Sequence, residues 1–437
     1  MSDRFTVLGL AHVRSAWFTE VARWSTAGSI PVDFVKCLTP EELRTRAASG
    51  RAFSAALLDA RLPAVDRDLL SLLQDHAIPS LVVAGPDDPR GWDLLGAAAV
   101  LAEPVSPAAL VDALGAHAHP IDGLAGDAAV DPADHAGTSA WRGRLVVCCG
   151  HPGAGTSTIA SSLAQGLADD PRYAGDVVLA DLARRAHQAV LHDARDVVPG
   201  LQELVEAHRT GRLSPEELHH LAFDVPSRGY RLVLGLRRPR DWVTIRARAF
   251  DAALEGLRRS ARLVVVDGDS DLEGEAETGS FDIEDRNHMA RASLGAADLV
   301  VLVATPTATG VHALVSQLHD LRAHGVPGGR VLVVVNRAPR TARARAELTR
   351  VVAALGGGAD RGEPAAGPVY VVERRGVDQL HRDVARFPAA LTGPPTRAVR
   401  DLLDRLPARA SDAMAHEPQR IAPGSLGRWA PDAEATS

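Results

Sequence analysis

The chain has 437 residues, which exceeds one ordinary domain and leaves room for two domains with separate cores. Hydrophobic residues make up 46% and charged residues 24% of the sequence, and this balance excludes a chain that is disordered throughout. The net charge of −7 argues against nucleic acid as an obligatory partner. No apolar run approaches the roughly 18 residues of a membrane-spanning helix, and the first residues lack a signal-peptide layout, so we predict a cytoplasmic protein.

Cysteine, histidine and lysine are distributed in a way that limits the chemistry. The three cysteines cannot form a disulfide framework, and neither they nor the scattered histidines have the spacing of a zinc site. Lys36 is the only lysine, because every other residue among the 48 Lys and Arg is arginine. Any mechanism that needs a lysine beyond residue 36 is therefore excluded.

Residues 1–119 have the pattern of a small α/β domain. Segments of helical period, such as Leu69–Gln74 and Ala108–Ala116, alternate with apolar runs. The predicted strands are Phe5–Leu10, Ser54–Asp59, Ser80–Ala84 and Ala98–Ala102. This alternation predicts a parallel sheet covered on both faces.

Residues 120–142 have no periodicity and are rich in Ala, Gly, Asp and Pro, which predicts an acidic flexible linker. A second α/β domain is predicted over residues 143–395, and most of its strands are continuous Val/Leu runs, as in sheets buried on both faces. These strands are Leu145–Cys149, Val177–Ala180, Leu232–Gly235, Leu263–Asp267, Leu299–Ala304, Val331–Asn336 and Val369–Val372. Residues 396–437 are predicted to form a short helix, Ala398–Leu406, and a disordered tail.

A glycine-rich segment at residues 150–158 follows the first of these strands and precedes a helical run. Gly153 and Gly155 would let the backbone wrap a phosphate, and the first N–H groups of the helix would point at it. Ser157 and Thr158 stand where hydroxyls would meet Mg²⁺ and a phosphate oxygen. The alternative is an ordinary tight turn between strand and helix, which the length, the two hydroxyls and the later strands disfavour.

Residues 151–158 resemble, without gaps, the deviant Walker A motif of the MinD/ParA family of P-loop ATPases, Lys-Gly-Gly-x-Gly-Lys-Thr-Thr. Four later segments follow in family order: residues 177–183 resemble Walker A′, 262–267 Walker B, 297–306 the Thr-Pro turn, and 331–337 the strand whose Asn reads the base. The resemblance implies a mostly parallel P-loop sheet that takes ATP and Mg²⁺. The residues it implies at the nucleotide are Gly150, His151, Pro152, Gly153, Ala154, Gly155, Thr156, Ser157, Thr158, Asn336 and Arg337. Ser157 and Asp267 would hold Mg²⁺, and Asp181 and Asp267 would be catalytic if the site were active.

The departures from this motif concern its charges. His151 and Thr156 stand where the family has its two lysines, and Ala183 replaces the carboxylate that positions water in the family. Phosphoryl transfer depends on positioning and on neutralising the γ-phosphate. We therefore expect weak ATP binding at most and very poor hydrolysis.

The first domain resembles a response-regulator receiver of flavodoxin-like fold, with Asp59 at the phosphoacceptor position. The lysine that receivers carry after the fifth strand is Glu103 here, the Ser/Thr position is Gly85, and the acidic pair after the first strand is missing. Mg²⁺ would lack oxygen ligands there. We predict a pseudo-receiver used for docking, and this disfavours a phosphorylation-gated regulator.

A receiver-like domain linked to a MinD-type domain is the layout of the CpaE/TadZ group of pilus-assembly proteins and of CpaE-like septum site-determining proteins. The resemblance implies a positioning or scaffold protein for septum placement or pilus assembly, whose partners are division or secretion proteins that recruit it to the membrane or septum. The alternative is an active MinD/ParA-type ATPase cycling on membrane or nucleoid. A homodimer that does not depend on ATP stays open.

Two arginine-rich stretches, residues 231–248 and 337–350, could contact DNA phosphates. Acidic residues flank both stretches and Trp242 is the one aromatic residue within them, so a solvated face is the favoured interpretation and DNA binding is not expected. The terminal helix mixes Arg and Asp evenly, which is a poor match for direct membrane binding.

Overall fold

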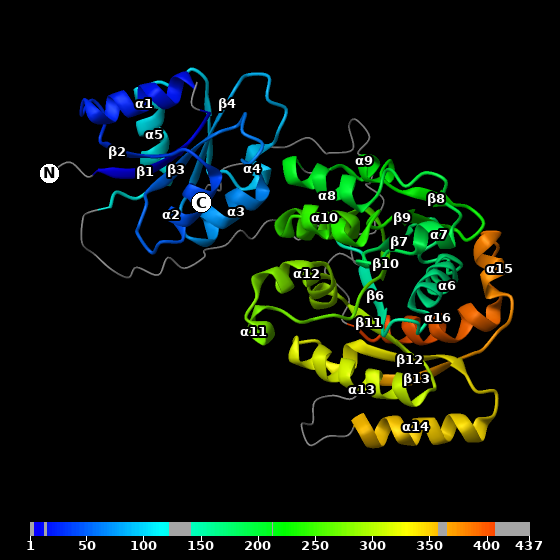
Figure 1. Ribbon diagram of the computed structural model, residues 1–437. Coiled ribbons are helices and arrows are strands. Elements are labelled where there is room, and N and C mark those ends of the chain that lie inside the picture. The colour runs from blue at the N-terminus through cyan, green and yellow to red at the C-terminus, as the bar shows by residue number, and fades with distance from the viewer. Residues whose placement is uncertain (1–3, 13–14, 122–140, 212, 357–364, 407–437) are drawn as a thin grey trace, which may run out of the picture.

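The computed structural model describes residues 4–12, 15–121, 141–211, 213–356 and 365–406. These residues form two α/β units, each with its own sheet, which lie beside one another in Figure 1. We call residues 4–121 the N-terminal unit and residues 141–406 the C-terminal unit. The predicted linker at 120–142 and the predicted disordered tail lie almost wholly outside the described residues.

The N-terminal unit has a five-stranded sheet in the order β2-β1-β3-β4-β5, with all neighbouring strands parallel. This is one of the two common orders of doubly wound sheets. Its strands are β1 (Phe5–Leu10), β2 (Val32–Cys37), β3 (Ala55–Asp59), β4 (Ser80–Ala84) and β5 (Ala99–Ala102). Its helices are α1 (Ala16–Thr26), α2 (Pro40–Ala47), α3 (Arg67–Asp75), α4 (Trp92–Leu95) and α5 (Pro107–His117). Buried residues of α2, α3 and α4 pack on one face, and those of α1 and α5 on the other.

The C-terminal unit has an eight-stranded sheet in the order β13-β12-β11-β6-β10-β7-β9-β8, parallel except between β8 and β9. Its strands are β6 (Arg144–Gly150), β7 (Val177–Asp181), β8 (Phe223–Val225), β9 (Tyr230–Val233), β10 (Leu263–Asp267), β11 (Leu299–Ala304), β12 (Val331–Ala338) and β13 (Ala366–Val372). Six of these eight strands confirm runs predicted from the sequence, and β9 begins and ends two residues earlier than expected.

Helices cover both faces of the eight-stranded sheet (Figure 1). The helical segments are α6 (Thr156–Ala168), α7 (Gln188–Leu191), α8 (Leu201–Thr210), α9 (Pro215–His219), η1 (Pro239–Thr244), α10 (Ala247–Ser260), α11 (Glu275–Thr278), α12 (Phe281–Ala296), α13 (Ala308–Ala323), η2 (Gly328–Arg330), α14 (Ala342–Gly356), α15 (Val377–Arg382) and α16 (Ala389–Leu403). The core on one face includes buried residues of α8, α10, α12 and α13, and the core on the other includes those of α6 and α16. None of the helices among the described residues combines the length and the apolar character that crossing a membrane requires.

Two edge strands have no counterpart in the sequence-based prediction. β2 lies at one edge of its sheet and exposes Asp33 and Lys36, so two charged residues interrupt its apolar sequence. β8 has only three residues and pairs antiparallel at the other sheet's edge. β8 is too short, and β2 too polar, to form the kind of continuous apolar run by which the other strands were predicted.

The last helix differs from the sequence-based prediction. A short helix was expected at Ala398–Leu406 outside the P-loop domain, but α16 begins at Ala389 and includes Pro394 and Pro395. The helix packs against α6, and Leu391, Val399 and Leu403 belong to the same core as the α6 residues. Tertiary packing therefore outweighs the two prolines, and this correction places the helix within the C-terminal unit.

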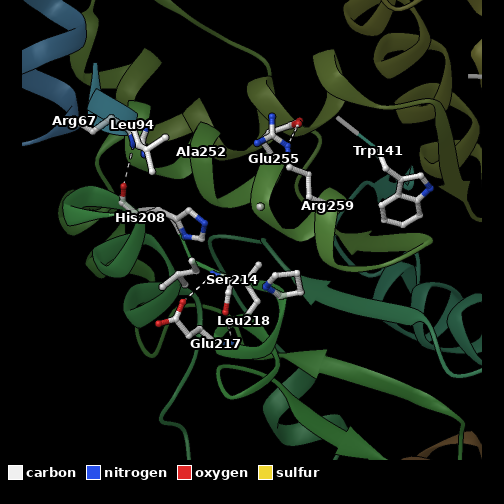
Figure 2. A pocket seen from close by; sticks show the side chains of 13 residues that line it. Arg67, Leu94, Trp141, His208, Ser214, Glu217, Leu218, Ala252, Glu255 and Arg259 are labelled. Atoms are coloured by element: carbon white, nitrogen blue, oxygen red, sulfur yellow. Dashed lines mark hydrogen bonds and ion pairs between the residues drawn. The ribbon is translucent and has the colours of Figure 1, made fainter. Parts of the chain in front are cut away.

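The two units meet where α3 of the N-terminal unit lies against α8 and α10 of the C-terminal unit. Arg67 Nε donates to the His208 carbonyl oxygen at 3.0 Å, and Arg209 pairs with Asp66 at 3.1 Å. A cavity of about 680 Å³ opens beside this contact, and Figure 2 shows Arg67 and Leu94 from the N-terminal unit at its edge.

Candidate functional site

The glycine loop joins the end of β6 to the start of α6 (Figure 1). Gly153 and Gly155 both have φ of +85°, a conformation that only glycine adopts without strain. A Cβ atom on Gly155 would lie 2.3 Å from Nδ2 of Asn336, and one on Gly150 would lie 2.3 Å from the Val303 carbonyl oxygen. The loop is therefore packed tightly against the ends of β11 and β12.

Asn336 anchors this loop. Its Nδ2 donates to the Ala154 carbonyl oxygen at 2.8 Å, and its Oδ1 accepts from the Arg337 backbone N–H at 2.9 Å. The side chain is buried. Asn336 was predicted to contact the base, but both ends of its amide are hydrogen-bonded within the protein. The neighbouring Arg337 is exposed and has a φ of +53°.

Two further side chains at the predicted phosphate site have partners within the protein. The ring of His151, at the first lysine position, donates from Nδ1 to the Pro152 carbonyl oxygen at 2.9 Å. Its Nε2 lies 3.3 Å from Oγ1 of Thr305. Oγ1 of Thr158 lies 3.0 Å from Nε2 of His381 in α15. The site thus presents backbone N–H groups and hydroxyls, and neither of the two lysine positions holds a lysine.

The two predicted carboxylates end neighbouring strands. Asp181 of β7 is in register with Asp267 of β10, and both are buried. Burial raises the pKa of Asp181 well above its ordinary value, and the nearby charge of Asp267 acts in the same direction. Burial also raises the pKa of Asp267, although a hydrogen bond from Ser157 favours its charged form. The structure therefore brings together Ser157, Asp181 and Asp267 at the ends of these strands.

Gln188 is the residue of this site that sequence analysis missed. It begins α7 and is fully buried. Its Nε2 donates to Asp267 Oδ2 at 2.7 Å and to the Ser157 carbonyl oxygen at 3.1 Å. Its Oε1 accepts from Ser161 Oγ at 2.9 Å. The one signal in the sequence was a glutamine seven residues after Asp181, in a segment where no motif assigns it a role.

The residues present fit a phosphate group better than they fit Mg²⁺. The left-handed glycines and the N-terminus of the 13-residue helix α6 favour an anion through backbone groups alone. Mg²⁺ requires oxygen ligands at about 2.0–2.1 Å in octahedral geometry. The Asp267 carboxylate that would supply such ligands instead accepts from the Gln188 amide. Among the described residues, no three His, Cys, Asp or Glu side chains gather as a metal site.

Asp59, the predicted phosphoacceptor position, lies at the end of β3 and is 1% exposed. Nε of Arg61 donates to Asp59 Oδ1 and its Nη2 to Oδ2, both at 3.0 Å. The same guanidinium reaches Glu103 at 3.5 Å. The carboxylate is thus occupied by a neighbouring arginine.

The arginine-rich stretches are partly neutralised within the protein. Arg231 pairs with Asp176, Arg237 with Glu203, and Arg248 with Asp75. In the second stretch, Arg345 donates from Nε to the Pro339 carbonyl oxygen at 2.8 Å.

Comparison with known proteins finds similarity in solved structures only. No protein-family model and no curated protein matches the chain. A ParA family ATPase from Chlorobium tepidum is 16% identical, with a TM-score of 0.46, over 60% of this chain and 99% of its own. MinD in the MinC:MinD complex of Aquifex aeolicus is 16% identical, with a TM-score of 0.43, over 61% of this chain and 98% of its own. MinD of Pyrococcus horikoshii, solved with Mg-ADP, is 14% identical, with a TM-score of 0.41, over 60% of this chain and 96% of its own.

Proposed function

We propose that the chain is a CpaE-like positioning or scaffold protein, of the kind represented by the septum site-determining protein Ssd, that regulates septum placement or Tad-type pilus assembly. Its P-loop unit keeps a degenerate nucleotide site that binds ATP weakly and hydrolyses it very slowly. Its partners are proteins of the division or secretion machinery, and these partners recruit it to the membrane or septum.

The observation that carries this proposal is the chemistry at the two lysine positions. His151 is engaged by Pro152 and Thr305, and Thr156 is a neutral residue at the start of α6. Lys36 lies in the N-terminal unit, on β2, so the C-terminal unit has no lysine. Without these cations, and with Ala183 in place of a carboxylate, the loop can hold a phosphate but lacks the groups that neutralise charge and orient water.

The division of the chain supports the same proposal. We assign residues 1–119 to a pseudo-receiver, 120–142 to a linker, and 143 onward to the MinD/ParA-like domain, with α16 included. The strand order of the N-terminal sheet is the flavodoxin-like order that receivers share, and Arg61 occupies its Asp59. A receiver-like unit that cannot use its aspartate is suited to docking.

One observation favours the second candidate, an active MinD/ParA-type ATPase cycling on membrane or nucleoid. Ser157, Asp181 and Asp267 do lie together at the carboxyl ends of β7 and β10. An arginine could replace a lysine in neutralising charge, and Arg184 is the nearest in sequence to Asp181. Its backbone N–H, however, donates to Asp269, and its Nη1 donates to Asn287.

Sedimentation velocity of the purified full chain separates the two candidates. A scaffold that works without a nucleotide cycle should have one sedimentation coefficient with or without ATP and Mg²⁺, whether it is a monomer or a dimer. The control is Asp267→Ala, which should sediment in the same way. A monomer that becomes a dimer only with ATP and Mg²⁺, and that fails to do so in Asp267→Ala, would favour the cycling ATPase.

A further inference from the structure

The amide of Gln188 lies at the centre of a group of oxygen atoms. Asp267 Oδ2 and the Ser157 carbonyl oxygen both accept from its nitrogen, and Ser161 Oγ donates to its oxygen. Both amide hydrogens and one lone pair are therefore used. The residue is fully buried, so water does not compete for these contacts.

The backbone of Gln188 is fixed as firmly as its side chain. Its N–H donates to Asp181 Oδ2 at 2.8 Å, and its carbonyl oxygen accepts from Nδ1 of His192 at 2.8 Å. His192 in turn accepts at Nε2 from the Tyr230 hydroxyl at 2.7 Å. Moving the amide away would leave several buried polar groups without partners, which costs free energy at each of them.

The amide engages Asp267 Oδ2, an oxygen of the carboxylate that would meet a cation, and the backbone carbonyl of Ser157, whose hydroxyl is the other predicted magnesium ligand. A neutral NH₂ group, with its partial positive charge on hydrogens, faces the Asp267 carboxylate and the Ser157 carbonyl. The nitrogen lies 2.7 and 3.1 Å from the two oxygens, which are hydrogen-bond distances and exceed the 2.0–2.1 Å or so of a magnesium bond. The carboxylate is thus satisfied without a metal.

We propose that Gln188 takes the place of the divalent cation, so that the glycine loop accepts a phosphate-bearing ligand without Mg²⁺. This inference rests on the proposed function, in which the loop holds a nucleotide. It goes further by naming the form of the ligand, a nucleotide free of metal, and the residue that excludes the metal. Gln188 is a positioning residue, and its side-chain amide occupies the Asp267 carboxylate that would otherwise bind the metal.

The first test measures metal binding without any nucleotide. Mn²⁺ stands in for Mg²⁺, and electron paramagnetic resonance gives the fraction bound to the full chain. We expect no site in the wild-type protein. We expect one site in Gln188→Ala, at least about tenfold tighter than any binding in the matched control Gln165→Ala. Gln165 is also a buried glutamine, but its amide contacts the Phe387 backbone instead of Asp267.

Two results would overturn the inference: one Mn²⁺ bound by the wild-type protein and lost in Asp267→Asn, or no gain in Gln188→Ala over the control. If Gln188→Ala does not fold, the isosteric Gln188→Glu decides, because it presents an oxygen where the amide nitrogen now lies. It should bind one Mn²⁺, and its failure to do so would count as the second result.

The second test uses ADP as the probe, titrated calorimetrically in excess MgCl₂ and in excess EDTA. We expect the wild-type dissociation constants in the two buffers to agree within about twofold. A tenfold loss of affinity in EDTA would overturn the inference. Failure of ADP to bind in both buffers would instead contradict the proposed nucleotide site, and the Mn²⁺ comparison would still decide on Gln188.

Discussion

Asp59 ends β3 with its carboxylate held by one guanidinium. Burial alone would raise the pKa of Asp59, but the hydrogen bonds and charge of Arg61 hold it below its ordinary value. The carboxylate is therefore ionised and paired. Both carboxylate oxygens of Asp59 accept from Arg61, which also contacts Glu103. The nucleophile of a phosphorylation reaction is therefore already hydrogen-bonded, and the negative charge of Glu103 would repel the phosphoryl group.

We predict that acetyl phosphate with Mg²⁺ does not label Asp59. Intact-mass spectrometry should detect no added phosphoryl group in the wild-type protein, and the same is expected of Arg61→Ala, because Glu103 and the missing acidic pair remain. Stoichiometric phosphorylation that Asp59→Asn abolishes would contradict the pseudo-receiver assignment.

His192 connects the glycine-loop site to the rest of the C-terminal unit. Burial lowers the pKa of His192 to about 4, and the neighbouring positive charge of Arg228 acts in the same direction. The folded protein therefore holds a neutral imidazole between about pH 4 and 6.5, where the unfolded chain binds a proton. Because this histidine then binds more protons in the unfolded state, its contribution to stability falls as pH falls through this range.

We predict that His192 removes about 3 kcal/mol from the free energy of unfolding of the C-terminal unit as pH is lowered from 6.5 to about 4, whereas the raised pKa values of Asp181 and Asp267 act in the opposite direction. Urea denaturation at several pH values measures the decrease. His192→Gln removes this titration, so between pH 6.5 and about 4 the change in unfolding free energy of the wild type should be about 3 kcal/mol less favourable than that of the variant. Parallel curves for the two proteins would show that His192 does not titrate as argued.

At the scale of elements, the sequence predicts the central strands well and the edges poorly. The runs at residues 263–267 and 299–304 match β10 and β11 to the residue, because strands buried on both faces are apolar throughout. β2 and α16 escaped prediction because an exposed edge and tertiary packing decide them. Within the site, the motif positions could be aligned, whereas the contact of Gln188 with Asp267 depends on a chain path that spacing does not reveal.

The contact between α6 and α16 depends on the absence of a side chain at Gly166. A Cβ atom there would lie 2.1 Å from Oγ1 of Thr396. We predict that Gly166→Ala destabilises the protein by about 1–3 kcal/mol through overpacking, although alanine favours a helix by about 1 kcal/mol. Thermal unfolding measures the loss, and the double variant Gly166→Ala, Thr396→Ala should recover most of it.

Gly115 in α5 provides the matched control. Apart from the two neighbouring residues and the backbone of its own helix, no described atom lies within 4 Å of the position that its Cβ would take. Gly115→Ala should therefore leave stability unchanged or raise it by up to about 1 kcal/mol. Equal losses in Gly115→Ala and Gly166→Ala would refute the argument from close helix packing.

At the scale of the whole molecule, the two units are joined by polar contacts. Oδ1 of Asp68 in α3 accepts from the Arg248 N–H at 3.1 Å, so a residue of the N-terminal unit caps the first turn of α10. Arg246, the residue before that helix, supplies no side-chain cap of its own. The pair of Arg248 with Asp75 is half exposed, so its contribution is small and depends on salt.

We predict that Asp68→Ala destabilises the first turn of α10, where the N-terminal unit contacts the C-terminal unit. Loss of a helix cap costs about 0.5–2 kcal/mol, which corresponds to a several-fold faster amide exchange in the first turn of α10. Hydrogen–deuterium exchange measures this rate. Asp33→Ala removes an exposed ion pair within the N-terminal unit and is the control, with no change expected in α10. Unchanged exchange in Asp68→Ala would contradict the capping role.

The central claim is that the glycine loop has lost the groups that drive phosphoryl transfer. Each charged hydrogen bond that a lysine would make to phosphate is worth about 1.5–3 kcal/mol, and His151 and Thr156 stand at the two lysine positions. Phosphate release from ATP by the purified full chain tests this claim most directly, beside the double variant Ser157→Ala, Asp267→Ala. The account predicts the same near-background rate for both proteins. Turnover in the wild type clearly above that of the double variant would contradict it.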